Sequence, residues 1–271
     1  MTLETLENGC RWEVLTEGQG RGKVMWKDLQ VAAIVVKVNK KGVVSLAKDP
    51  RVSDGKTGHV TVTVPSHPGL RADLDIPFRY DIAFSAHFSG TKGFDGSNGL
   101  DGTNGTDGTM GSTDPNNPSP GGNGSDGTDG SPGGDGDRGG EGPPVQVGVA
   151  LQPGGHPFLQ ISVHSQGKQN FYLVDPLGGS LTVTSSGGSG GSGGRGGRGG
   201  RGGSGGIGTP SGTDGRNGLD GRNGDDGPNG RDGSITVTYD PQAKPYLSTI
   251  HLPSVNGPKP ALREQPVPAL W

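Results

Sequence analysis

The sequence predicts an all-β protein: an antiparallel β-sandwich that carries two inserted hairpins of polyglycine-II or polyproline-II type helix, which pack into a rod-like bundle. Glycine recurs at every third position in four stretches, residues 90–111, 121–142, 187–206 and 212–233, called segments 1 to 4 below. Apolar residues alternate with polar ones before, between and after these segments, which is typical of strands with one buried face. No stretch has the periodicity of an amphipathic helix.

The composition limits how much of the chain can form an ordinary core. Of 271 residues, 57 are glycine, 22 are proline and only 27% are hydrophobic. Glycine and proline at this level with a three-residue period favour a collagen-like or related helix rather than disorder. The apolar residues concentrate in 11–88, 145–183 and 235–252, which is enough for one modest β-rich body.

The predicted strands give the domain boundaries. The run 31–38 is strand-like and apolar except for Lys37, the run 59–64 alternates strictly, and the run 78–88 places apolar residues on one face. We therefore assign residues 1–89, 143–186 and 234–252 to one discontinuous β-sandwich body. Residues 253–271 form a proline-rich tail.

Glycine at every third position has a structural meaning. A polyproline-II helix has three residues per turn and no internal hydrogen bonds, so every third residue lies on one edge. Glycine on that edge lets another backbone approach and pair with the free amide groups. Each segment would be about 60–70 Å long at 3.1 Å per residue.

The order of segments and strands predicts two hairpins, residues 90–142 and 187–233. Each leaves a strand, turns at 112–120 or at 207–211, and returns to a strand. Because the paired segments are similar in length, both turns should lie at the same far end of the rod. Segment 3 repeats Gly-Gly-X and has two bare edges, so we place it nearest the middle. A collagen-type trimer and a disordered linker are the alternatives.

This arrangement resembles two known groups of glycine-rich proteins. Segments such as GGSGGSGGRGGRGG and GTDGRNGLDGRNG between β-strands resemble the glycine-rich region of the anaplastic lymphoma kinase ectodomain. They are also similar to the tip adhesins of T-even-like phage tail fibres. The resemblance implies a rigid glycine lattice whose loops or faces bind another protein, in an adhesin-like or receptor-like role. This chain lacks the receptor's cysteines and the long aromatic-rich loops of the adhesins.

Two repeats within the segments suggest ligands. The Arg-Gly-Gly repeat resembles RNA-binding boxes and makes nucleic-acid binding through Arg195, Arg198 and Arg201 the alternative function. The Asp/Asn ladders of segments 1 and 4 offer oxygens to Ca²⁺, although residues three apart are about 9 Å apart along one helix. The spacing of like charges is the simpler explanation of the alternating Asp and Asn.

The remaining features bear on the class of protein. A net charge of −3, a single cysteine, and the lack of a signal-like or membrane-spanning stretch predict a protein that is cytoplasmic as synthesised. Membership of a larger assembly or particle is a further hypothesis. No catalytic motif is present, so we expect a non-enzymatic structural protein without a cofactor, either a monomer or a small homo-oligomer.

The expected partner is a protein. The candidate contacts at the two turns are Pro115, Asn116, Asn117 and Pro210, for which plain turns are the alternative. Trp271 either belongs to a docking peptide or packs back on the body.

Overall fold

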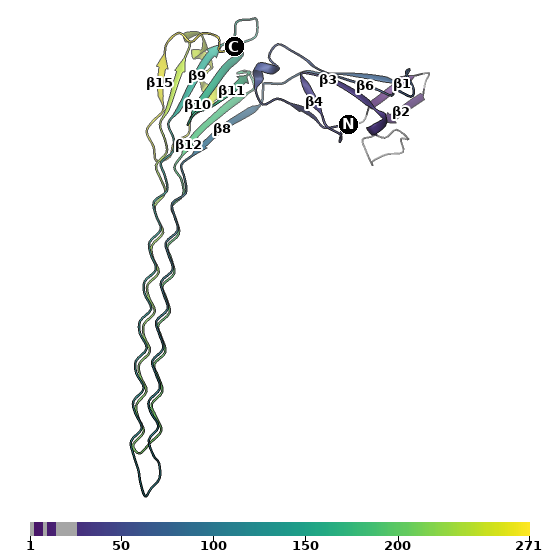
Figure 1. The fold of residues 1–271 in the computed structure, drawn as a ribbon. Coiled ribbons are helices and arrows are strands. Elements are labelled where there is room, and N and C mark those ends of the chain that lie inside the picture. Colours follow the sequence, from purple (N-terminus) through teal and green to yellow (C-terminus); the bar gives the residue numbers. More distant parts are fainter. Residues whose placement is uncertain (1–2, 8–9, 15–25) are drawn as a thin grey trace.

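The computed structural model describes residues 3–7, 10–14 and 26–271, and strands predominate over helices in it. Five sheets and one long rod make up most of the described chain (Figure 1). Its short 3₁₀ helices are η1 (Trp26–Asp28), η2 (Pro50–Val52) and η3 (Pro241–Thr249). The strand prediction is therefore confirmed at the level of fold class.

The first seven strands form small sheets of their own, called the N-terminal arm. These strands are β1 (Leu3–Glu7), β2 (Cys10–Val14), β3 (Gln30–Ile34), β4 (Val36–Val38), β5 (Val44–Leu46), β6 (Gly58–Thr63) and β7 (Arg71–Ile76). β1 pairs with β2, β4 pairs with β5, and β3-β6-β7 form a three-stranded antiparallel sheet.

The sequence-based assignment of residues 1–89 to the sandwich body is therefore wrong for the arm, whose strands pair only among themselves. One physical reason lies in the run 31–38, which was expected to be a single strand. Val35 has a φ of 67° and breaks the run into β3 and β4, so its apolar residues serve two small sheets.

The body consists of two sheets with a shared core. Its strands are β8 (Ala83–Ser89), β9 (Val145–Leu151), β10 (Leu159–Ser165), β11 (Lys168–Val174), β12 (Ser180–Ser186), β13 (Ile235–Tyr239), β14 (Ile250–His251) and β15 (Ala261–Glu264). The order is β11-β10-β9-β13-β15 in one sheet and β14-β12-β8 in the other. Alternate residues of both sheets, among them Val147, Ile161 and Val183, are buried in one apolar cluster.

The body is mixed rather than antiparallel, which corrects the sequence-based prediction. β9, β10 and β11 are antiparallel, but β8 runs parallel to β12, and β13 runs parallel to both β9 and β15. The hairpins explain the parallel pairs. β8 and β12 both lead out into the rod, whereas β9 and β13 both receive the chain as it returns.

Residues 253–271 do not form a separate tail, because β15 extends the five-stranded sheet. Beyond β15 the chain crosses the body, where the N–H of Leu270 donates to Gln160 and the Gln160 side-chain amide donates to the Trp271 carbonyl. Gln160 is buried, so these bonds satisfy its polar groups.

Candidate functional site

The four glycine segments lie side by side and project from the body as one rod (Figure 1). The bonds between them repeat every third residue. Gly99 donates its N–H to the carbonyl of Arg195 in segment 3 at 2.7 Å, and Gly130 donates to Leu219 in segment 4 at 2.9 Å. Segments 1 and 3 are parallel, as are 2 and 4, while segment 2 is antiparallel to 1 and segment 4 is antiparallel to 3.

The register of the rod continues that of the body. In the strands, Ser89 is paired with Ser186 and Val145 with Ile235. The side-chain bonds between segments 1 and 3 keep the same offset of 97 residues, and those between segments 2 and 4 keep the same offset of 90. The parallel strand pairs thus set the alignment of the parallel rod segments.

Segments 2 and 3 share the centre of the rod. Each exchanges backbone hydrogen bonds with all three other segments, whereas the described residues show none between segments 1 and 4. Every second glycine of the Gly-Gly-X repeat is buried, and a Cβ on Gly197 would meet the carbonyl oxygen of Leu100. The expectation that segment 3 lies innermost was incomplete. Segment 2 also fits there because small residues such as Ser131 and Gly134 face segment 1.

The Asp/Asn ladders are hydrogen-bond acceptors for the neighbouring backbone. In segment 1, Asp101 accepts the N–H of Arg198 at 2.7 Å and Asn104 accepts that of Arg201 at 2.8 Å. The same bond recurs along three ladders, whose acceptors are Asp95, Asn98, Asp101, Asn104 and Asp107; Asn123, Asp126, Asp129 and Asp135; and Asp214, Asn217, Asp220, Asn223, Asp226, Asn229 and Asp232.

Segment 3 gains most from these ladders. In its repeats over residues 190–204, the first glycine donates its N–H to a segment 4 side chain and the second glycine donates to a segment 2 carbonyl. The X residue donates its N–H to a segment 1 side chain. For example, Gly196 donates to Asn223, Gly197 to Ser131 and Arg198 to Asp101. Among the described residues, no backbone hydrogen bond joins two residues of segment 3, so its N–H groups need these acceptors on other segments.

Two ladder carboxylates also have a lowered pKa. The Lys92 ammonium, with the N–H of Ser192, holds the pKa of Asp95 below its ordinary value. The N–H of Val255, with those of Gly187 and Asn256, does the same for Asp232. Both groups favour the folded state above the ordinary aspartate pKa, and this contribution is lost as the pH falls through the lowered values.

The two turns meet at the far end of the rod, a region called the tip below (Figure 1). The Thr209 N–H donates to the Ser119 carbonyl at 2.8 Å, and the Gly121 N–H donates to the Pro210 carbonyl at 3.0 Å, so the turns are bonded to each other. Within the first turn, Asp114 accepts the N–H of Asn116 at 2.8 Å. Pro115, Asn116, Asn117 and Pro210 are all exposed there.

Trp271 lies apart from the other predicted contacts, on the body. Its indole N–H donates to Asp54 Oδ2 at 2.7 Å, and its ring meets Phe171 edge-on at 5.8 Å. Asp54 also accepts from Gln152 at 3.0 Å. Of the two roles considered for Trp271, the structure shows packing on the body, where it links the arm to β11.

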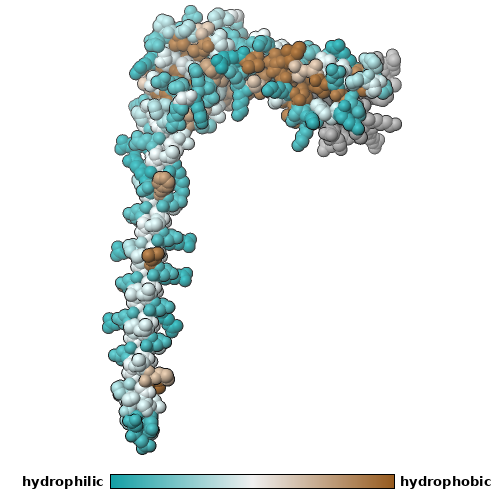
Figure 2. Space-filling view, in the orientation of Figure 1, coloured by the Kyte–Doolittle hydropathy of each residue, from teal (hydrophilic) through white to brown (hydrophobic). Residues whose placement is uncertain are grey.

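The three arginines of the Arg-Gly-Gly repeat are exposed on the rod. The backbone N–H groups of these arginines donate to ladder oxygens. No ion pair involves their side chains among the described residues. Figure 2 shows the rod as a pale column with hydrophilic side chains projecting from it. The exposed apolar residues on it, spread along its length, are Phe94, Leu100, Met110, Ile207 and Leu219.

We expect Trp271→Ala to lower the free energy of unfolding by about 2 kcal/mol, because it removes a half-buried ring and its hydrogen bond. Trp271→Phe keeps most of the ring and should lose about 1 kcal/mol, the worth of the bond to Asp54. Thermal melting of the two variants measures both losses. An unchanged melting temperature for Trp271→Ala would mean that the residue does not fasten the arm.

Comparisons with known proteins returned no match, whether with family models, with curated proteins or with solved structures. No helix in the described part of the chain is long and apolar enough to cross a membrane. Within the described ranges, no three His, Cys, Asp or Glu side chains are grouped to hold a metal ion. Calcium binding by the ladders stays a prediction.

Sequence reasoning missed the main role of the ladders. The signal was present in the strict placement of Asp or Asn one residue before the repeating glycine. Both side chains carry an oxygen at the same distance from the backbone. Their interchange therefore indicates a shared acceptor rather than a spacing of charge.

Proposed function

We propose that this chain is a non-enzymatic structural and interaction protein, in which four polyglycine-II helices form a rigid stalk on a β-sandwich body and present a protein-binding surface at the tip. The observation that carries the proposal is the meeting of both turns at one end, bonded to each other through Thr209 and Ser119. A hairpin that served only to connect strands would not need a long paired stalk.

The contacts of the rod support a stiff spacer. Each segment is held to at least two others at every turn, and the strands of the body fix its base in register. Bending would have to break several of these bonds together. At about 3.1 Å per residue, the stalk holds the tip about 65 Å from the body.

Photo-crosslinking tests the tip as the binding surface. A photoreactive amino acid is placed at Asn116 in one variant and at Leu219 in a matched control, whose side chain is 73% exposed midway along the rod. In extracts of the cells that produce the protein, the tip variant should crosslink a protein that the control does not. Identical products from both positions, or none from the tip, would contradict the proposal.

A register-matched deletion tests the stalk. Removing residues 97–102, 129–134, 193–198 and 219–224 takes two turns from every segment and keeps all remaining pairs aligned. We expect a folded protein whose longest dimension, measured by solution X-ray scattering, is shorter by about 19 Å. Deleting 97–102 alone should instead disorder the rod, because segment 1 then loses register with its neighbours.

The same scattering experiment, combined with a mass measurement, addresses the collagen-like alternative. The pairing described above lies within one chain, so we expect the mass of a monomer with an elongated profile. A particle of three chains would support a trimeric structural protein instead.

A further inference from the structure

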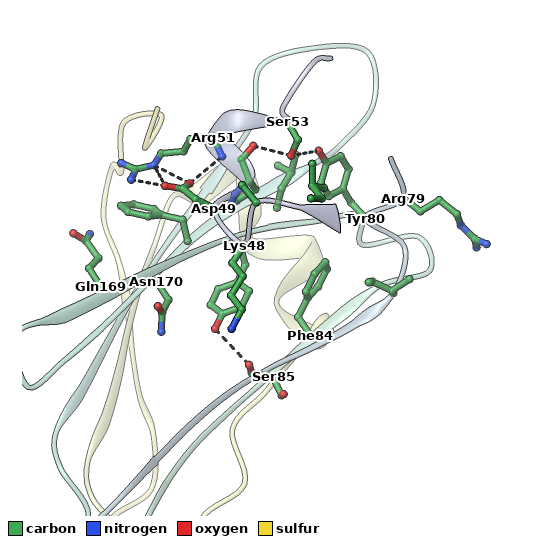
Figure 3. A pocket seen from close by; sticks show the side chains of 17 residues that line it. Lys48, Asp49, Arg51, Ser53, Arg79, Tyr80, Phe84, Ser85, Gln169 and Asn170 are labelled. Atoms are coloured by element: carbon green, nitrogen blue, oxygen red, sulfur yellow. Dashed lines mark hydrogen bonds and ion pairs between the residues drawn. The ribbon is translucent and has the colours of Figure 1, made fainter. Parts of the chain in front are cut away.

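A cavity of about 590 Å³ lies where residues of the arm and of the body come together (Figure 3). Three stretches line it: residues 46–53 around η2, residues 79–85 at the start of β8, and five consecutive residues of β11, Gln169 to Leu173. Its size falls in the range of sites that hold ligands.

The cavity lies along the open edge of β11. Tyr172 points to the core side of the sheet, where its ring meets Phe84 at 6.0 Å, and Phe171 points to the opposite side, where it meets Trp271. A space lined from both faces of one strand must run along that strand's edge.

That edge has no strand beside it. β11 is the terminal strand of its sheet, and its register is with β10 alone. Just beyond β11, the Asp175 N–H donates to the Tyr80 carbonyl at 2.9 Å. Among the described residues, Gln169 to Leu173 have no backbone hydrogen bond to any segment other than β10. Unpaired strand edges of this kind accept a further strand.

The lining combines apolar and basic groups. Ile82, which is 46% exposed, and Leu46, which is 39% exposed, line the cavity together with the rings of Phe84 and Tyr172. Figure 2 shows hydrophobic residues gathered over the arm near the body. Three cations, Lys48, Arg51 and Arg79, line the cavity. Arg51 is ion-paired with Asp49 and Arg79 with Asp81, whereas Lys48 has no ion pair among the described residues. A partner with alternating apolar and acidic side chains would complement this surface.

We propose that the cavity binds an extended acidic peptide segment of another protein, which adds as a strand to the edge of β11. Side chains of the peptide that point inward contact Phe84 and Tyr172. The acidic side chains of the peptide pair with Lys48, because the Arg51 guanidinium, which covers the Phe171 ring at 3.9 Å, is already paired with Asp49. This site is separate from the tip and does not depend on the function proposed for it.

The test measures fluorescence anisotropy of labelled peptides against the full chain. The probe is a capped peptide of alternating Val and Glu with seven residues, the length of β11. Three control peptides are compared with it. One has every Glu replaced by Lys. Each of the other two carries N-methyl groups on one of the two alternating sets of backbone nitrogens, so that each blocks one edge of the peptide strand. We expect the Val-Glu peptide to bind, the Lys peptide to bind at least about tenfold more weakly, and one of the two N-methylated peptides to lose at least about tenfold.

Two protein variants locate the site. Lys48→Glu should weaken binding of the Val-Glu peptide by about tenfold or more, whereas Lys259→Glu, an exposed charge reversal outside the cavity, should leave it unchanged. Circular dichroism checks that both variants are folded. The proposal is overturned if the Val-Glu peptide does not bind, if neither N-methylation weakens it, or if Lys259→Glu weakens it as much as Lys48→Glu does.

Discussion

Gly197→Ala should open the rod around the substituted residue. The new methyl group would overlap the Leu100 carbonyl, which lies against this edge of segment 3. The segments must then separate, and the bonds that Gly197 makes with Ser131 and Gly221 are strained or lost. Overpacking and lost hydrogen bonds together should cost about 3 kcal/mol. Amide hydrogen exchange at neighbouring Gly194 and Gly200 should therefore become about a hundredfold faster.

Arg198→Ala is the matched control for this prediction. It lies one residue further along the same segment, but its side chain is exposed and its N–H bond to Asp101 needs only the backbone. Exchange at the same glycines should be unchanged. Equal effects from the two variants would show that the bare edge of segment 3 is not packed against segment 1.

Replacing all five ladder residues of segment 1 by alanine should destabilise the rod by about 2.5–5 kcal/mol. Each substitution removes the acceptor of one N–H in segment 3, and a lost hydrogen bond costs about 0.5–1 kcal/mol where water can partly replace it. The five residues are Asp95, Asn98, Asp101, Asn104 and Asp107. Hydrogen exchange of the segment 3 amides measures the loss.

An all-asparagine ladder separates hydrogen bonding from charge. Changing Asp95, Asp101 and Asp107 to Asn removes the same three negative charges as the alanine set but keeps every side-chain oxygen. Its rod should be about as stable as that of the parent protein. If the asparagine and alanine sets lose the same stability, the ladders act through charge and not as acceptors.

The sequence indicates where the glycine segments and their turns lie, because glycine periodicity acts locally. The glycines of 90–111 and 187–206 require a bare edge wherever they lie, and the turns at 112–120 and 207–211 follow from the breaks in the period. Strands such as β6 and β12 were likewise visible as strict alternation.

The pairing between distant elements was not predictable in the same way. The parallel partnership of β8 with β12 depends on how two hairpins stack, and no local pattern encodes it. The break at Val35 depends on an unusual backbone angle for a β-branched residue. The cavity along the edge of β11 arises only where the arm, the start of β8 and β11 converge.

Residue-resolved amide hydrogen exchange by NMR tests most directly whether the glycine segments of one chain pair through their backbones. In segment 3, slow exchange is expected at both glycines and at the X residue of the repeats from Gly190 to Gly205, because all three N–H groups have acceptors. In segment 1, the repeating glycines should exchange slowly and the ladder residues quickly, giving a period of three. Uniformly fast exchange, or protection that disappears on dilution, would contradict an intramolecular rod.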